Sequence, residues 1–292
     1  MMKCCLITFC FLRAFIFAEE ARTCSSFQFS REQVEDYHTK TTSQQERTAK
    51  IVESEFFADA KTVLDIGCGD GRITAFLAEK LPNSSIIGCD VSKSMIEFAL
   101  EKFTSSEYPN LSFIEKDATN LGFNDKFDRI ISFNCLHWIN NQQKVLDEIS
   151  ASLKSGGKAL IISSPKTDKD DLQSVCAKVM ISSKWSSYFK NYPQIHSFHT
   201  EEDYQKMLKK TDLSIAKIQQ TVIDMPFVDR PSLENFLNAV MTPVHHLPEN
   251  KRRDFLEDVF MLLQERGRVD EKGKIHLHIA QLELLLTKST LH

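Results

Sequence analysis

Four features are missing from this chain of 292 residues, and each absence narrows what the protein can be. Its eight cysteines form no C-x-x-C pair, which argues against a zinc site and gives no sign of a disulfide framework. It has no excess of positive charge, since 36 Lys and Arg face 40 Asp and Glu, and phosphate binding needs a basic face. Beyond the N-terminus no apolar run approaches about 20 residues, and no repeats or low-complexity segments occur. We therefore expect a globular protein with no metal, no nucleic-acid partner and no internal membrane span.

The N-terminus departs from this ordinary composition. Lys3 precedes an almost wholly apolar stretch over residues 4–17, and Ala18 then meets two glutamates. A basic start, an apolar centre and a small residue at a polar boundary describe a secretory signal peptide over residues 1–18. Arg13 interrupts the apolar run, so other interpretations stay open, in which the segment is an apolar leader, a loose membrane tether or the product of a misassigned start codon.

Short apolar runs alternate with amphipathic segments through the first half of the chain. This alternation of strand and helix predicts an α/β fold with a parallel sheet and right-handed crossovers. The predicted strands are 62–66, 85–89, 111–115, 127–133 and 158–163, and the predicted helices are 71–80, 93–103 and 142–154, the last stopped by the two glycines at 156–157.

The chain divides into a lead-in, a core and a C-terminal part. Residues 25–60 indicate a helical lead-in, with Ser30 as an N-cap. Residues 61–165 hold the alternating strands and helices. Residues 166–292 predict a helical, aromatic segment at 167–197, a helix at 201–210, a strand at 213–227, two helices within 231–267, and an edge or hairpin strand at 274–286.

A glycine loop follows the first predicted strand. Asp65 stands near the end of the apolar run, and Gly67, Gly69 and Gly71 follow at alternate positions before a helix. The order strand, glycine loop, helix is typical of the nucleotide-binding turn of a doubly wound sheet, because glycine lets the backbone approach a ligand closely. A carboxylate at the strand end could hold an ammonium group, directly or through water. The alternative is a glycine-rich turn without a ligand.

Acidic residues also follow the second and third predicted strands. Asp90 could accept hydrogen bonds from both hydroxyls of a ribose, with Val91 and Met95 beside the nucleoside. Asp117 and the backbone N–H of Ala118 suit the edge of an adenine. The alternatives are a solvent-exposed strand-end Asp90 and a turn Asp117.

The fourth predicted strand ends in Phe133 and Asn134, followed by His137 and Trp138. In open α/β sheets, ligands bind beyond the carboxyl ends of the strands. We therefore expect His137 and Trp138 to face the reactive end of the cofactor. A core tryptophan and a histidine satisfied by its neighbours are the simpler alternative.

Together these residues resemble a class I S-adenosylmethionine (SAM)-dependent methyltransferase. Within that class, the segment at 132–141 is similar to the juvenile hormone acid methyltransferases, and the group also includes the trans-aconitate and malonyl-carrier carboxyl methyltransferases. The lead-in resembles the Tyr…Gln…Ala pattern of the hormone enzymes through Tyr37, Gln44 or Gln45, and Ala49. The resemblance implies a Rossmann-like, seven-stranded, mostly parallel sheet with helical cap insertions in the C-terminal half.

The same resemblance implies a residue-by-residue site. The cofactor would be S-adenosyl-L-methionine, the partner a small-molecule acid, and the protein a monomer or homodimer in the cytoplasm, where SAM is made, or exported if residues 1–18 act as a signal peptide. Catalytic candidates are Trp138, His137, Gln45 and Gln44, with Trp185 of the cap beside them. Cofactor-binding candidates are Asp65, Gly67, Gly69, Gly71, Asp90, Val91, Met95, Asp117, Ala118, Phe133 and Asn134.

A carboxylate acceptor needs no general base, because it is already ionised at neutral pH. Transfer from a sulfonium cation to a carboxylate anion gives two neutral centres, so exclusion of water favours it. The resemblance to carboxyl methyltransferases therefore implies formation of an O-methyl ester, a reaction for which these residue types suffice. Two alternatives stay open: methylation of a quinone, phenol or amine, in which His137 would act as base, and a non-catalytic SAM-binding or secreted interaction protein.

Overall fold

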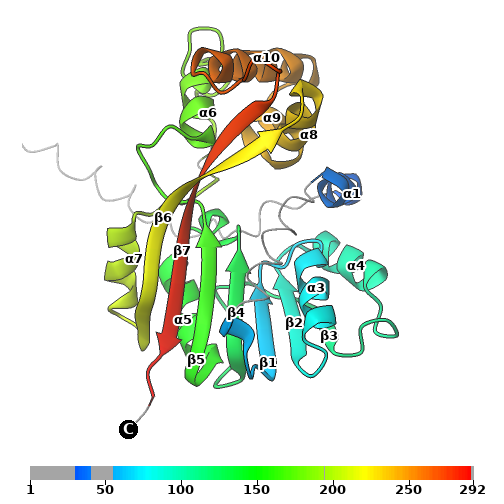
Figure 1. Ribbon diagram of the computed structural model, residues 1–292, viewed down its shortest axis with the longest axis vertical. Coiled ribbons are helices and arrows are strands. Elements are labelled where there is room, and N and C mark those ends of the chain that lie inside the picture. The colour runs from blue at the N-terminus through cyan, green and yellow to red at the C-terminus, as the bar shows by residue number, and fades with distance from the viewer. Residues whose placement is uncertain (1–29, 41–54, 194, 291–292) are drawn as a thin grey trace, which may run out of the picture.

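One seven-stranded sheet organises the chain in the computed structural model, which describes residues 30–40, 55–193 and 195–290 (Figure 1). The strand order is β3-β2-β1-β4-β5-β7-β6. The first five strands are parallel, and β7 runs antiparallel to both β5 and β6. This topology confirms the predicted Rossmann-like fold class. The strands are β1 (Thr62–Ile66), β2 (Ser85–Asp90), β3 (Leu111–Glu115), β4 (Phe127–Phe133), β5 (Leu153–Ser163), β6 (Leu213–Phe227) and β7 (Ile275–Lys288).

Helices cover both faces of the sheet. On one face, α5 (Gln142–Ser152) and α7 (Glu201–Leu208) bury apolar side chains against the sheet in one core cluster. On the other face, α3 (Arg72–Lys80) and α4 (Lys93–Lys102) pack in a second cluster, which also takes Phe57 of the short 3₁₀ helix η2 (Glu55–Phe57). The central strands are therefore buried on both sides, as their nearly continuous apolar sequences require.

A helical cap stands on the far ends of β6 and β7 (Figure 1). These two strands pair along their whole length, from Leu213 opposite Lys288 to Phe227 opposite Ile275, but only residues 282–287 of β7 also pair with β5. The ribbon thus runs beyond the sheet and carries a third apolar cluster. The cap helices are α6 (Leu172–Met180), α8 (Arg230–Val240), α9 (Thr242–His246) and α10 (Glu249–Glu265).

The helix α1 (Arg31–Lys40) bridges the two lobes, since it packs against α4 of the core and α8 of the cap. Val34 joins a small cluster with Met95 and Phe98 of α4. The position of α1 brings Tyr37 to the junction between core and cap. The predicted segments that fall on residues 1–29 and 41–54, including the leader at 1–18, Gln44 and Gln45, lie outside the described residues.

Four predictions of secondary structure need correction, and the first is that residues 231–267 hold three helices, α8, α9 and α10, where two were expected. The helix expected over 142–154 ends at Ser152, and the glycines that were expected to stop it lie inside β5, where Gly156 takes a φ of +75° beside an irregularity in the β4–β5 register. Only α6 is helical within 167–197; the rest of that segment, as far as it is described, is turns and extended chain, because serines and Pro193 interrupt the pattern. The last strand pairs antiparallel with β6, but α8, α9 and α10 separate the two strands, so they form no hairpin, and β7 is an inner strand while β6 occupies the edge. Within the described ranges, no helix has the length and apolar character to cross a membrane.

Candidate functional site

The glycine loop between β1 and α3 contains three left-handed residues with different tasks. Gly67, Gly69 and Gly71 have φ values of +74°, +54° and +77°. A Cβ on Gly67 would lie 2.2 Å from the Cys135 sulfur. The chain after β1 therefore approaches the chain after β4 so closely that only glycine fits. A Cβ on Gly69 would meet nothing within 4 Å, whereas one on Gly71 would lie 2.6 Å from the Phe113 ring. Gly69 thus borders open space, and Gly71 allows close packing of the loop.

Asp90 at the end of β2 is bound to this loop. Its Oδ2 accepts a hydrogen bond from the Gly69 N–H at 3.0 Å, and its Oδ1 accepts one from the Ser92 N–H at 2.8 Å. Burial raises the pKa of the carboxyl group, although these backbone donors act in the opposite direction. Each carboxylate oxygen keeps a further lone pair, so Asp90 can accept two more hydrogen bonds from a ligand.

A cavity of about 150 Å³ lies over the loop at the carboxyl ends of β1, β2 and β4. Asp117 stands at its edge and accepts hydrogen bonds from the N–H and hydroxyl of Thr119 through Oδ1, both at 2.8 Å, which leaves Oδ2 for a ligand. Nine predicted cofactor residues line this cavity: Gly67, Gly69, Asp90, Val91, Met95, Asp117, Ala118, Phe133 and Asn134.

Two predicted cofactor residues do not line that cavity. Asp65 is 2% exposed, and its Oδ2 accepts a hydrogen bond from the Thr74 hydroxyl at 2.7 Å. Burial raises its pKa to about 7, and the charges of Asp90 and Asp70 act in the same direction. Gly71 packs against α4 and β3 instead. Both residues therefore lie one layer behind the predicted cofactor surface.

A larger cavity of about 380 Å³ adjoins the first, between the core and the cap. The two cavities share Tyr37 of α1, and Asn134 and Trp138 from the end of β4. Most of the remaining lining is apolar and comes from α6, α8 and the cap ends of β6 and β7, including Leu172, Met180, Met225, Phe236, Val240, Met241 and Ile279. A ligand in one cavity can therefore meet a ligand in the other at these three shared side chains.

His137 and His196 lie at the base of the larger cavity. His137 is the middle residue of the 3₁₀ helix η3 (Leu136–Trp138), and its ring stacks on that of His196 with centroids 5.7 Å apart. Burial lowers the pKa of His137 to about 3 and that of His196 to about 4. Both imidazoles are therefore neutral at pH 7. Trp138 contacts the same His196 ring at a centroid distance of 4.3 Å.

Comparison with known proteins places this geometry in a family. A family model described as a methyltransferase domain matches residues 57–214. The methyltransferase-designated protein 235L of Invertebrate iridescent virus 6 is 31% identical over 202 residues, which cover 69% of this chain and 74% of the viral protein. The chain belongs to the methyltransferase family. The juvenile hormone acid O-methyltransferase of Bombyx mori is 27% identical over 217 residues, 71% of this chain and 76% of that protein.

A solved structure shares the fold of this methyltransferase. The O-methyltransferase of a Brevibacillus brevis polyketide synthase, solved with S-adenosyl-L-homocysteine, superposes with a TM-score of 0.52 at 20% identity, over 90% of this chain and 80% of that one. Family membership confirms the predicted SAM-dependent methyltransferase enzyme. The smaller cavity also fits its cofactor, because Asp90 and Asp117 keep free acceptor capacity beside a glycine whose Cβ would enter open space.

The predicted catalytic residues have separate outcomes. Trp138 and His137 line the larger cavity, while Gln44 and Gln45 lie outside the described residues. Trp185 is 1% exposed, and its indole N–H donates to Asp258 at 2.5 Å, so it belongs to the cap core and the prediction that it lines the site is wrong. The sequence signalled Tyr37 only through the lead-in pattern. The place of His196 between the cap and the next helix allowed a substrate contact, but a solvated loop was the favoured interpretation, and the structure places His196 in the cavity lining instead.

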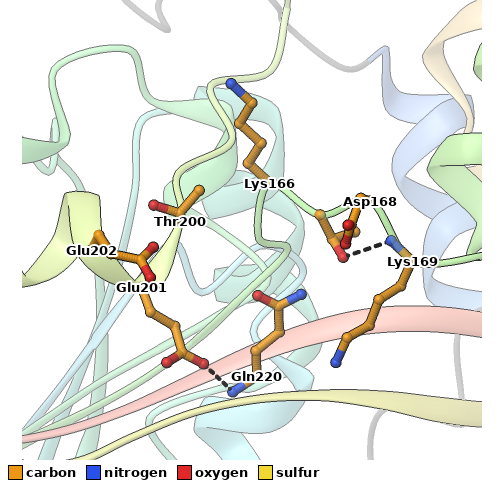
Figure 2. A pocket seen from close by; sticks show the side chains of 8 residues that line it. Lys166, Asp168, Lys169, Thr200, Glu201, Glu202 and Gln220 are labelled. Atoms are coloured by element: carbon orange, nitrogen blue, oxygen red, sulfur yellow. Dashed lines mark hydrogen bonds between the residues drawn. The ribbon is translucent and has the colours of Figure 1, made fainter.

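A third cavity, of about 490 Å³, is lined by a separate set of residues (Figure 2). Its lining mixes the lysines that follow β5 with the acidic start of α7, and it shares no residue with the other two. Glu201 is already bound there, because it accepts a hydrogen bond from the Gln220 N–H at 2.8 Å. Opposed charges and internal hydrogen bonds make this groove a solvated surface. Among the described residues, no group of three His, Cys, Asp or Glu side chains could hold a metal ion.

Proposed function

We propose that this methyltransferase transfers the methyl group of SAM to the carboxylate of a small lipophilic acid, forming a methyl ester. The observation that carries the proposal is the pair of adjoining cavities that share Tyr37, Asn134 and Trp138. One of them fits the cofactor, and the other has a mostly apolar lining and neutral polar groups. Relatives named for acid substrates, such as the Bombyx mori enzyme, support the same acceptor chemistry.

The charge of the larger cavity favours an acceptor with one carboxylate. No Lys or Arg stands among the side chains that line it within the described chain, and its histidines at 137 and 196 are neutral at pH 7. A second carboxylate on the acceptor would lose its hydration without gaining a cationic partner, which costs several kcal/mol. The apolar side chains of the cap are instead suited to a hydrocarbon body.

The side chains of this chain bind and orient the two reactants. Asp90, Asp117 and the glycine loop hold the cofactor, which when bound supplies an activated methyl group on a sulfonium. Tyr37, Asn134 and Trp138 stand where the two ligands meet and fix the approach of the acceptor oxygen. The cap excludes water, which favours the joining of a cation and an anion into neutral products.

A phenol or amine acceptor receives less support from this geometry. Such an acceptor must lose a proton, and His137 was the predicted base. A base with a pKa of about 3 holds a proton too weakly for that task at neutral pH. The amide and indole groups at the junction are not bases either. A carboxylate acceptor is already ionised at neutral pH and needs no general base.

The test is a matched series of acceptors that share one hydrocarbon skeleton. The series holds a monocarboxylic acid, the dicarboxylic acid, the alcohol and the amine, each offered with labelled SAM, and kcat/KM is measured for each. We expect kcat/KM for the monoacid to exceed that for the diacid by about 100-fold, because the diacid must bury an unpaired charge. Alcohol or amine turnover above that of the monoacid would overturn the proposal.

A further inference from the structure

The hydrogen bonds of His137 determine where its imidazole proton lies. Nδ1 lies 3.3 Å from the backbone N of Ser164 and 3.2 Å from the Ser163 hydroxyl. A backbone N–H can only donate, so Nδ1 is the acceptor in the Ser164 contact. A neutral imidazole whose Nδ1 accepts carries its proton on Nε2. The end of β5 therefore selects the Nε2–H tautomer.

The remaining contacts hold the ring in this orientation. The His137 carbonyl oxygen accepts a hydrogen bond from the Ser197 N–H at 2.8 Å, and the ring stacks on His196 and on Phe198. Among the described residues, Nε2 has no hydrogen-bond partner. It is also not one of the solvent-inaccessible side-chain atoms that lack a partner, so it remains accessible from the cavity. The polar atom of His137 that a ligand in the larger cavity can reach is therefore Nε2.

The surroundings keep this donor uncharged. The titratable side chains that share the cavity with His137 are Tyr37, Cys176, Tyr192, His196 and His245, so no carboxylate lines it among the described residues. Burial raises the pKa of the Cys176 thiol and of the Tyr192 phenol, so neither is anionic at neutral pH. The pKa of each histidine is lowered by burial. A carboxylate that entered would thus meet an N–H dipole and no cation.

We propose that His137, fixed as its Nε2–H tautomer, donates a hydrogen bond to the acceptor carboxylate and positions it for methyl transfer. This role rests on the proposed function. A neutral donor suits the reaction, because the carboxylate loses its charge as the new O–C bond forms. A cationic donor would stabilise the anionic acceptor more than the transition state and would slow the transfer. The hydrogen bond occupies one carboxylate oxygen and leaves the other to attack.

Two variants of similar shape separate hydrogen-bond donation from Nε2 from a purely structural role of Nδ1. His137→Gln keeps an N–H donor near the place of Nε2 but removes the acceptor for the Ser164 N–H. His137→Asn keeps an acceptor near Nδ1 and removes the Nε2 donor. We expect His137→Gln to retain kcat/KM within about fivefold and His137→Asn to lose about 10- to 100-fold, the range for a hydrogen bond to a charged group. Thermal unfolding should show the reverse order, with His137→Asn the more stable variant.

Titration of the acid into the enzyme saturated with S-adenosylhomocysteine gives a readout without turnover, and His137→Asn should weaken acid binding by a similar factor. ¹⁵N spectra of the wild-type imidazole should show the proton on Nε2. Equal loss of activity in both variants, or higher activity in His137→Asn than in His137→Gln, would overturn the inference. Wild-type enzyme is assayed alongside: absence of any methyl ester from it would overturn the proposed function itself, whereas ester formation with a reversed variant order removes only the role of His137.

Discussion

Two carboxylates, the half-buried Asp90 and the buried Asp65, shape the cofactor cavity of this methyltransferase. Each carboxylate oxygen of Asp90 accepts one backbone hydrogen bond, from the Gly69 N–H or from the Ser92 N–H. The remaining lone pairs can accept hydrogen bonds from a ligand. Asp65 stands behind the loop, bound to Thr74 and shielded from water. The two residues look alike in sequence, since each lies at the end of an apolar strand, but their different burial gives them different tasks.

Asp90→Asn tests the first of these tasks. An amide offers only one acceptor oxygen, so its NH₂ group must face either the Gly69 or the Ser92 N–H, and one ligand hydrogen bond is lost as well. We expect the Kd for SAM to rise about 10- to 100-fold, as measured by calorimetry. Asp168→Asn, in the surface groove, is the control and should leave the Kd unchanged. A normal Kd in Asp90→Asn would remove this residue from the cofactor site.

Asp65 predicts a pH dependence of stability. Its pKa is raised from 3.8 unfolded to about 7 folded, so between these values the folded state binds more protons than the unfolded state. The free energy of unfolding of the ligand-free protein should therefore fall as pH rises through that window, by about 4 kcal/mol from this group alone. Asp65→Asn keeps the acceptor for Thr74 and removes the charge, so its urea midpoint should exceed that of wild type by more at pH 7 than at pH 4. Parallel profiles would contradict the raised pKa.

The sequence was sufficient to predict which residues line the cavities when those residues lie at the end of a single strand. Asp90, Asp117 and Trp138 follow strands whose order could be inferred from the apolar runs, and all three line the cavities. His196 lies on irregular chain that no periodicity describes, so the sequence favoured a solvated loop over the substrate contact that its place beside the cap allowed. Trp185 was misplaced for a related reason, since a buried aromatic of the cap core and an aromatic of a substrate cavity look the same in sequence.

At the scale of elements, the glycine loop divides its work between binding and packing. A methyl group on Gly69 would enter the cofactor cavity, whereas one on Gly71 would collide with Phe113 and Ala99. Both positions have positive φ, so each alanine also carries backbone strain of about 1 kcal/mol.

The variants Gly69→Ala and Gly71→Ala should separate these effects. Gly69→Ala should lower stability by only about 1 kcal/mol while it weakens SAM binding severely. Gly71→Ala should cost about 3 kcal/mol or more, because the loop must shift away from α4 and β3. Denaturant unfolding and calorimetric Kd values measure both. A Gly69→Ala protein with unchanged SAM affinity would show that the loop does not border the cofactor.

Within the cap, Trp185→Phe distinguishes a structural from a substrate-binding aromatic. The change removes the hydrogen bond to Asp258 and leaves an acceptor with one partner fewer, so we expect a loss of about 1–3 kcal/mol of stability. The KM for the acid should stay within about threefold of wild type. Tyr192→Phe is the contrasting variant, because Tyr192 lines the acceptor cavity and its hydroxyl pairs with Thr242, so this KM should change. A changed KM in Trp185→Phe alone would place Trp185 at the substrate.

Elements that depend on local pattern were predictable, and those that depend on distant partners were not. The five parallel strands show continuous apolar runs and agree closely with prediction. The start of β5 did not, because Gly156 and Gly157 have the composition of a helix stop, and only the pairing of the flanking Leu153 and Lys158 with β4 draws this segment into the sheet. The inner position of β7 likewise depends on β6, a partner about 60 residues earlier in the sequence.

For the whole molecule, the position of the cap determines the acceptor. The sheet and its glycine loop account for the cofactor cavity alone. The long β6–β7 ribbon carries four cap helices over the carboxyl end of the sheet, and α1 joins both lobes at Tyr37 (Figure 1). Between them lies an apolar space with neutral polar groups and no cationic side chain among its described lining residues. Such a space favours an acceptor that is already a nucleophile, and a carboxylate on a hydrocarbon body meets that requirement.

The chemical lability of the transferred methyl group tests this account most directly. Enzyme, SAM with a labelled methyl group and a panel of lipophilic monocarboxylic acids are incubated, and the labelled product is treated with hydroxide. A methyl ester releases its label as volatile methanol, because hydroxide cleaves esters and leaves methyl ethers and methylamines intact. The account predicts base-labile label with at least one monoacid and none in its absence. Label that survives hydroxide would place the methyl group on a hydroxyl or an amine and would contradict carboxylate methylation.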